Sequence, residues 1–413
     1  MPVDATRARR LIVAAAVAAL ALRLLFGLAY WAGKPLTHDE REYLALAGSL
    51  AAGRGFTYGP DHESGTAQQF GRAPLYPMAL AAIGATRGAY DESPARVKVA
   101  QSAAGALIVA LIGAIAWRAA GPRAGAAAAA ISAVYPPLVW YPAYVLSETF
   151  YSLLALAAAF GLQLASDRAD RAHSSRAGGP LALLAGGLAG AAVLTRPAML
   201  LFVPLAILWL AARRRHVLAV ALVAGAAAVV LPWTARNYRV YDRFVLVASE
   251  GGATFWTGNH PLSRGEGDLA TNPGLKRAEL EFREAHPGLT AEELEPLYYR
   301  DALGHIRDDP GWWLGLLARK AFYTVVPAGP SYGVHSVRYR VLSIGSYLAV
   351  LPFALAGARR LWRGSRPPSA LFLLAGSAVL VGLIFFPQER FRVPVIDPVL
   401  IVCAAASGRR GAS

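Results

Sequence analysis

Two adjacent carboxylates, Asp39 and Glu40, follow the first long apolar segment of the chain, and Arg72 lies further along the same polar stretch. A carboxylate within hydrogen-bond reach of a hydroxyl can accept its proton while the oxygen attacks a carbon atom. A guanidinium group can bind a phosphate through two parallel hydrogen bonds and stabilise the charge that a phosphate leaving group develops. These residue types therefore fit the transfer of a group from a phosphate to a hydroxyl.

The elements that must position these residues are predicted to be membrane-spanning helices. The chain is 55% hydrophobic and only 16% charged, against about 25% charged residues in a typical soluble domain. Long apolar runs recur from residue 11 to residue 407, and each crossing of a bilayer needs roughly 20 apolar residues. The net charge of +15 comes largely from arginines in short loops between these runs, so it indicates helix orientation and not nucleic-acid binding.

The arginine-rich loops predict how the chain is threaded, because Lys and Arg gather on the cytoplasmic side of a membrane. The clusters at 118–123, 168–176, 213–215, 359–366 and 409–410 are all cytoplasmic if the chain crosses about ten times, within a range of about 8 to 12. Both termini are then cytoplasmic, and the first apolar run is a retained anchor. The predicted crossings are 11–31, 95–117, 124–140, 148–165, 180–195, 198–212, 217–233, 340–358, 369–386 and 394–407.

Two long segments lie on the extracytoplasmic side in this threading. Residues 32–94 form a first external loop with two short helices, 39–52 and 74–86, that lie at the membrane interface. Residues 234–311 are polar and form a small soluble loop domain, and the aromatic stretch 310–326 suits the headgroup level. The predicted division is a transmembrane core at 1–233, an external loop at 234–311, and an interfacial helix with C-terminal transmembrane helices at 312–413.

Charged residues of both signs are expected at the external membrane boundary. Ionisable groups near the hydrocarbon cost about 2.5–3.5 kcal/mol on insertion scales, so they usually mark a site or a pathway. Simpler interpretations stay open, because the acids could offset a helix dipole and the arginines could anchor helices at the interface. Arg23, in the middle of the first crossing, is predicted to pair with another helix in a structural role. The boundary residues are Asp39, Glu40, Arg72, Glu148, Arg196, Arg236, Arg390 and Arg392.

A metal site is the other chemistry to weigh. His38 lies beside two carboxylates, and imidazole and carboxylate ligands suit several divalent ions. Asp39 and Glu148 are the candidate ligands, but we expect that no metal or other cofactor is required, with a divalent metal as the open alternative. Cys403 is the only cysteine, so a disulfide framework and a thiolate metal cluster are excluded.

The strings around these positions carry a family resemblance. The first loop resembles that of the dolichyl-phosphate-mannose protein mannosyltransferase-like proteins, the glycosyltransferase 39 group of the GT-C superfamily, and the chain also resembles the lipid A aminoarabinose transferase group. Six motifs occur in the right order along almost the whole chain. They are Thr37-His38-Asp39-Glu40 with Gly53-Arg54-Gly55-Phe56, Arg72-Ala73-Pro74-Leu75, Leu146-Ser147-Glu148-Thr149, Leu194-Thr195-Arg196-Pro197, Pro232-Trp233-Thr234-Ala235-Arg236 and Arg390-Phe391-Arg392-Val393-Pro394.

The resemblance implies an all-α GT-C-like membrane bundle and a glycosyltransferase of the cell envelope that moves a hexosyl or pentosyl group. The donor would be a polyprenyl-phosphate sugar, and the acceptor a glycan, lipid or protein on the external face. Asp39 would deprotonate the acceptor and Glu40 would orient the acceptor or the sugar. Arg72 would hold the donor phosphate, with Arg390, Arg392 and Arg196 behind it. Direct attack predicts inversion at the anomeric carbon, whereas a retaining reaction would need Glu148 as a nucleophile.

Two other functions remain as alternatives. A transporter or flippase of a lipid-linked or anionic solute should place charges near the bilayer midplane at the interface of a repeat. The sequence shows no internal repeat, and Arg23 alone is expected at that depth. A structural subunit with a degenerate site is disfavoured by the presence of Asp39, Glu40 and Arg72.

Overall fold

The computed structural model describes residues 4–58, 71–86, 92–267, 269–327, 329–364 and 367–408. Within these ranges the regular elements are helices, and one isolated pairing joins Pro35 to Glu92. The predicted all-α polytopic fold is therefore confirmed. Part of the first external loop and the arginine pair at 409–410 lie outside the described residues.

Six helices are long and apolar enough to cross a membrane, and three shorter apolar segments accompany them in the described part of the chain. The shorter segments are η3 (Pro197–Leu201) with α9 (Phe202–Ala212), α16 (Ser369–Ile384) and α18 (Ile396–Ser407). The six long helices are α1 (Ala5–Leu25, continued by the π-helical turn Phe26–Tyr30), α4 (Ala95–Ala120), α7 (Glu148–Arg171), α8 (Ser175–Thr195), α10 (His216–Tyr241) and α15 (Val337–Trp362).

The crossing predicted at 124–140 is not one continuous helix. It is divided into α5 (Pro122–Val134) and α6 (Pro136–Trp140), and Tyr135 between them has an extended backbone. The residue before a proline is disfavoured in helical conformation, because the proline ring clashes with its backbone and Cβ. Pro136 therefore ends the helix where apolar composition alone predicted that it would continue.

Helix α10 extends further than predicted. It runs to Tyr241 instead of stopping at 233, and Asp242 caps it in a left-handed conformation. Polar residues such as Arg236 and Asn237 can continue a helix beyond the bilayer, so hydropathy underestimates its length. The predicted boundary between a transmembrane core and an external loop at 233–234 thus falls inside a continuous helix.

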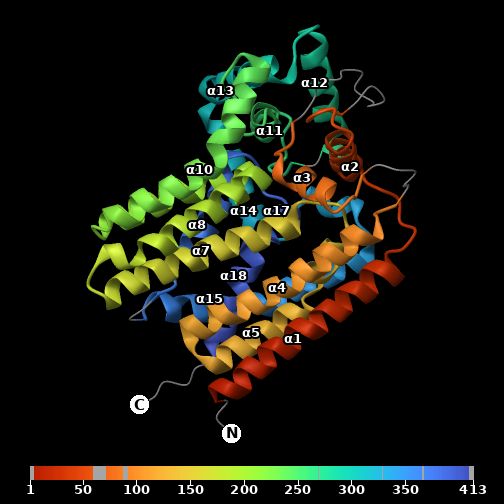
Figure 1. The fold of residues 1–413 in the computed structure, drawn as a ribbon. Coiled ribbons are helices and arrows are strands. Elements are labelled where there is room, and N and C mark those ends of the chain that lie inside the picture. The colour runs from red at the N-terminus through yellow and green to blue at the C-terminus, as the bar shows by residue number, and fades with distance from the viewer. Residues whose placement is uncertain are drawn as a thin grey trace.

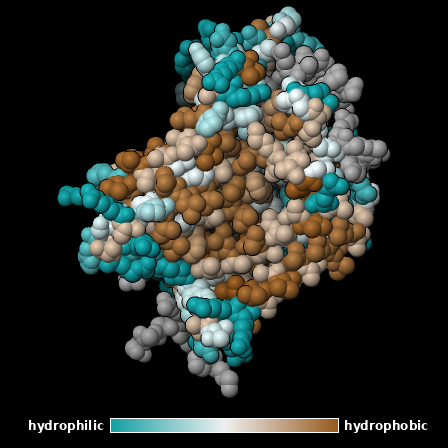
Figure 2. Space-filling view, in the orientation of Figure 1, coloured by the Kyte–Doolittle hydropathy of each residue, from teal (hydrophilic) through white to brown (hydrophobic). Residues whose placement is uncertain are grey.

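The helices pack in two groups around a core rich in alanine and glycine. Helices α7, α8 and α10 lie side by side, while α1, α4 and α5 form a second group, with α15 and α18 between the groups (Figure 1). An apolar surface runs across the middle of the molecule between hydrophilic ends (Figure 2). This pattern is the one expected of a bundle that spans a bilayer.

One end of the bundle carries the short helices of the two loop segments. These are α2 (His38–Ala51), α3 (Leu75–Ala82), α11 (Gly251–Asn259), α12 (Pro273–Glu284) and α13 (Ala291–Asp308). The start of α1 and the end of α18 lie toward the opposite end (Figure 1). The two short helices predicted in the first loop therefore form, with α3 shorter at its end than the predicted 74–86.

The aromatic stretch predicted at the membrane interface forms α14 (Pro310–Val325) and connects this end to the bundle. The Lys320 side chain is buried and its Nζ donates to Oδ1 of Asn259 at 2.9 Å and to the carbonyl of Leu383 at 3.2 Å. Trp313 Nε1 donates to the same Asn259 oxygen at 3.0 Å. Lys320 thus offsets the negative end of the α16 dipole while it fastens α11 and α14 to that helix.

The close approach of α8 and α10 supplies a test of the packing. A Cβ on Gly186 would overlap the carbonyl of Leu222, whereas a Cβ on the neighbouring Gly187 would come no closer than 4.0 Å to the atoms around it. We expect Gly186→Ala to lower the free energy of unfolding by about 1–3 kcal/mol, because overpacking displaces the helices. Thermal unfolding in detergent measures the change.

Gly187→Ala is the matched control. It should be neutral or stabilise by up to about 1 kcal/mol, because alanine favours a helix over glycine. Equal effects of the two substitutions would contradict the close packing of α8 on α10.

Candidate functional site

The first turn of α2 is fixed by Glu40. The backbone N–H and the hydroxyl of Thr37 donate to Glu40 Oε2 at 2.8 Å and 2.9 Å, which completes a capping box with Thr37 at the N-cap. The other oxygen, Oε1, accepts from the backbone N–H of Val145 at 2.8 Å. Glu40 is buried and both of its oxygens are engaged with backbone, so it anchors α2 on the segment before α7.

Asp39, its neighbour in sequence, faces two arginines. Arg72 Nη2 donates to Asp39 Oδ1 at 2.6 Å, and Arg390 Nη1 donates to Asp39 Oδ2 at 2.6 Å. Arg72 precedes α3, and Arg390 lies on the short helix α17 (Glu389–Arg392) between α16 and α18. The Asp39 carboxylate therefore joins the first loop to the C-terminal part of the bundle.

Glu148 continues the chain of charges at the start of α7. Its Oε1 accepts from Arg390 Nε at 2.9 Å and lies 2.8 Å from Arg196 Nη1. Arg196 also donates to the Ser147 hydroxyl at 3.1 Å, and that hydroxyl is 3.2 Å from Tyr43 OH. Glu148 is 1% exposed, so its charge depends on these two guanidinium groups.

Two acids that sequence reasoning did not assign complete the arrangement. Glu42 accepts from Arg72 Nε at 2.8 Å and also pairs with Nη2, and Glu250, the residue before α11, lies 3.8 Å from Arg72 Nη1. Glu42 follows Asp39 by three positions, so helical spacing could have placed both on one face. Glu250 carries no comparable signal in the sequence. We call the set the charged network: Asp39, Glu42, Arg72, Glu148, Arg196, Glu250 and Arg390.

The network controls the protonation of Asp39. Burial alone would raise the pKa of Asp39, but the charges and hydrogen bonds of Arg72 and Arg390 hold it well below its usual range. For Arg72 and Arg390 the two effects have the opposite signs: burial lowers the pKa of each guanidinium, and the neighbouring carboxylates raise it. Together the carboxylates have the larger effect, so both pKa values lie well above the usual arginine value. In this arrangement Asp39 is a carboxylate and a weak base.

Arg392 lies apart from the network although it is two residues from Arg390. Its Nε is 2.9 Å from Asp397 Oδ1, and its guanidinium lies 4.1 Å from the centre of the Tyr347 ring. Asp397 also accepts from Tyr135 OH at 3.0 Å. The structure therefore places Arg392 in a buried pair between α17, α18 and α15 and not beside Asp39.

The candidate metal ligands are already occupied by cations of the protein. Arg390 donates to both Asp39 and Glu148, so its guanidinium stands between the two carboxylates. His38 Nε2 faces Glu42 Oε1 at 3.4 Å. Among the described residues no group of three His, Cys, Asp or Glu side chains could hold a metal ion. These residues do not fit a metal in this arrangement.

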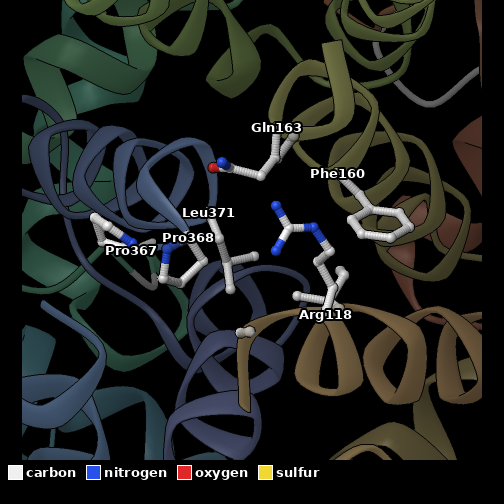
Figure 3. Close-up of a pocket in the computed structure, with 9 residues that line it drawn as sticks. Arg118, Phe160, Gln163, Pro367, Pro368 and Leu371 are labelled. Atoms are coloured by element: carbon white, nitrogen blue, oxygen red, sulfur yellow. The ribbon is translucent and has the colours of Figure 1, made fainter. Parts of the chain in front are cut away.

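A cavity lies at the end of the bundle away from the charged network. Arg118, Phe160 and Gln163 line it from α4 and α7, across from Leu371 and the residues that precede α16 (Figure 3). Arg118 pairs with Asp167, and Gln163 Oε1 accepts from the N–H of Ala370 at 3.2 Å. The polar side chains that line this cavity, Arg118 and Gln163, are thus paired with groups near the ends of neighbouring helices. We do not include the cavity in the candidate site.

The low pKa of Asp39 predicts how the network responds to acid. A carboxyl whose pKa is depressed by folding stabilises the protein above its unfolded pKa of about 3.9, and this contribution is lost as the pH falls through the folded pKa. At pH 7, Asp39→Asn should lower the free energy of unfolding by about 2 kcal/mol. The difference should stay constant from about pH 8 to 5 and shrink below about pH 4.

The measurement is thermal unfolding of both proteins in detergent over this pH range. A difference that changed between pH 5 and 8 would show that the Asp39 carboxyl titrates near neutrality and that the two arginines do not hold it ionised.

No protein-family model and no curated protein matches the sequence. The oligosaccharyltransferase AglB from Archaeoglobus fulgidus, in complex with an inhibitory peptide and a dolichol-phosphate, matches 96% of this chain and 49% of its own with a TM-score of 0.60 and 17% identity. The same enzyme tethered with an acceptor peptide matches 98% of this chain and 49% of its own, with a TM-score of 0.61 and 15% identity.

ArnT from Cupriavidus metallidurans bound to undecaprenyl phosphate matches 97% of this chain and 77% of its own, with a TM-score of 0.41 and 16% identity. The chain spans about half the length of AglB. At these identities the likeness establishes the fold: this chain has the membrane fold of the oligosaccharyltransferase AglB, as its resemblance to GT-C proteins predicted.

Proposed function

We propose that this protein is a membrane glycosyltransferase that moves a sugar from a polyprenyl-phosphate donor to an acceptor hydroxyl or amine. The observation that supports this most is the Asp39 carboxylate held between Arg72 and Arg390 at one end of a membrane bundle. A carboxylate can accept the acceptor proton, and the two guanidinium groups can bind the phosphate of the donor. The AglB structure that shares this fold is a complex with a dolichol-phosphate, which is a lipid of the proposed class.

The low pKa of Asp39 suggests how the reaction is coupled to donor binding. A donor phosphate that takes hydrogen bonds from Arg72 and Arg390 competes with Asp39 for them. Once these contacts weaken, burial favours the neutral form of the carboxyl, so its pKa rises and Asp39 becomes a stronger base. The base is thereby activated when the donor is in place.

The proposed chemical step is a direct displacement. The acceptor oxygen or nitrogen forms a bond to the anomeric carbon while the bond from that carbon to the phosphate oxygen breaks. Asp39 takes the acceptor proton, and the electron pair leaves with the polyprenyl phosphate, whose additional negative charge is stabilised by Arg72 and Arg390. One displacement inverts the anomeric carbon.

The geometry also revises the roles expected from the motifs. We assign Glu40 as a positioning residue for α2, because both of its oxygens bind backbone and Thr37. Glu148 is suited to orient Arg390 and Arg196 and not to attack the sugar, since one of its oxygens already receives both arginines. Arg392 pairs with Asp397 and is left out of the donor-phosphate set.

The threading and the domains follow from the same proposal. The charged network would face the extracytoplasmic side, both termini would be cytoplasmic, and α11 to α13 would form an external cap that helps to bind the acceptor. A transporter or flippase is less well supported, because the network lies beside the loop helices α2 and α11 and not midway along the bundle. No step of the proposed reaction passes through a metal.

The base assignment is tested by Asp39→Asn. Transfer of labelled sugar from a panel of polyprenyl-phosphate sugars should fall at least about 100-fold, because general-base catalysis contributes about 10²–10⁴ in rate. Binding of undecaprenyl phosphate should persist, since Arg72 and Arg390 remain.

Glu42→Gln is the matched control, because Glu42 pairs with Arg72 as Asp39 does but is not the proposed base. It should keep most of the activity. Wild-type turnover by purified Asp39→Asn protein would refute the base role, and the absence of transfer from every donor by the wild-type protein would count against the proposed function.

The phosphate role is tested by Arg72→Met. The affinity for undecaprenyl phosphate should fall about 10-fold or more, which corresponds to about 1.4 kcal/mol, and turnover should fall as well. Arg392→Met serves as the control for the loss of a buried guanidinium outside the network. Scintillation proximity binding with labelled lipid measures both, and equal affinity in wild-type and Arg72→Met protein would contradict the assignment.

A further inference from the structure

Arg23 is a buried cation in the last turn of α1, within the apolar span that continues to Tyr30. Its side chain is 1% exposed, and its Nη1 donates to the carbonyls of Ala19 at 3.1 Å and Ala133 at 3.2 Å, while Nη2 donates to that of Ser132 at 3.2 Å. The last two carbonyls lie at the end of α5, so the guanidinium caps that helix. These bonds account for Nη1 and Nη2 but not for Nε, which is buried without a hydrogen-bond partner.

Glu148 presents the complementary problem. Arg196 and Arg390 both approach Oε1, and Oε2 is buried without a partner. A buried carboxylate oxygen left without a hydrogen bond destabilises the folded protein, because it has lost the water that would solvate it. A donor on the side of Oε2 would remove this cost.

Arg23 and Glu148 line the same small cavity. Its walls come from α1, α4, the segment 138–142, α7 and the segment between α17 and α18, and they include Tyr141 and Ser152. Ser152 donates to the carbonyl of Pro394 at 2.6 Å, so its hydroxyl hydrogen is engaged elsewhere. The cavity has room for about one water molecule, which needs at least two polar partners to be held there.

We propose that one water molecule in this cavity bridges Nε of Arg23 to Oε2 of Glu148, and that Arg23 is thereby a positioning residue for the charged network. The N–H of Arg23 donates to the water, and the water donates to the carboxylate. Glu148 then has donors on both oxygens and presents Oε1 to Arg390 and Arg196 in a fixed orientation. The catalytic importance of this bridge rests on the proposed function, whereas the bridge itself does not.

Gly105 on α4 makes this placement of Arg23 sterically feasible. A Cβ at this position would lie 2.7 Å from Arg23 Nε and 2.8 Å from its Cδ. Any larger residue would therefore push the guanidinium away from its present place. The close packing gives a second way to disturb Nε without removing the charge.

The experiment is a double-mutant cycle between Arg23→Met and Glu148→Gln, measured by thermal unfolding in detergent, so that it needs no substrate. We expect each single substitution to lower the apparent Tm by about 5 °C or more. In the Glu148→Gln protein, Arg23→Met should cost clearly less than in the wild type, because the partner of its Nε is already altered. Arg23→Lys, which keeps the cation, should recover part of the loss only while Glu148 is present.

Lys98→Met is the matched control. Lys98 is a buried cation of α4 whose Nζ donates to the carbonyl of Trp31 at 3.2 Å, and it does not line the cavity. Its effect should add to that of Glu148→Gln. The bridge would be overturned if the Tm losses of Arg23→Met and Glu148→Gln were additive. It would also be overturned if Lys98→Met were coupled to Glu148→Gln as strongly as Arg23→Met is.

Gly105→Ala replaces Arg23→Met in the same cycle if the latter protein does not fold. Its coupling to Glu148→Gln should have the same sign, and additivity would overturn the proposal. A failure of sugar transfer in every assay would sink the proposed function but leave this coupling unchanged, so the two outcomes are distinguishable.

Discussion

The sharing of one carboxylate between two guanidinium groups is the interaction on which the arrangement of this end of the molecule depends. Asp39 lies at the start of α2, Arg72 before α3, and Arg390 on α17, so two hydrogen bonds join two points of the first loop to the C-terminal part of the chain. Charges withdrawn from water to this extent need a partner of opposite sign, and the fully buried Glu148 needs one most, since an isolated buried ion costs several kcal/mol. The alternation of acids and bases from Glu42 to Arg196 meets that requirement.

The surrounding fold holds this network by means of ordinary helix-end chemistry. Glu40 closes the capping box of α2 and binds Val145, which fixes where Asp39 points. Glu148 begins α7, and a carboxylate at that position is favoured by the helix dipole. Helix capping therefore explains Glu40, and the proposed site role falls to its neighbour Asp39, which pairs with Arg72 and Arg390.

The sequence predicted the parts of this arrangement that depend on composition and on local strings. Apolar runs located the membrane helices, and the motif residues Asp39, Arg72, Glu148, Arg196 and Arg390 do lie together. Local strings cannot show which way a side chain points, so Glu40 and Arg392 were grouped with residues that they do not contact. Glu250 and the partners of Arg23 depend on tertiary packing alone, and the break at Tyr135 depends on a proline that hydropathy does not weigh.

Stability and reactivity make opposite demands on Asp39. The two arginines that pair with this half-buried carboxylate also hold its pKa low, and a carboxylate so well satisfied is a poor proton acceptor. The conflict disappears if the substrate supplies the competing anion, because the same guanidinium groups then serve the phosphate and release the base. On this account Glu148 matters as the residue that keeps Arg390 in place while its partner changes from Asp39 to phosphate. A buried Arg23 behind Glu148 would serve the same purpose, because Glu148 can hold Arg390 in place only if its own carboxylate is fixed.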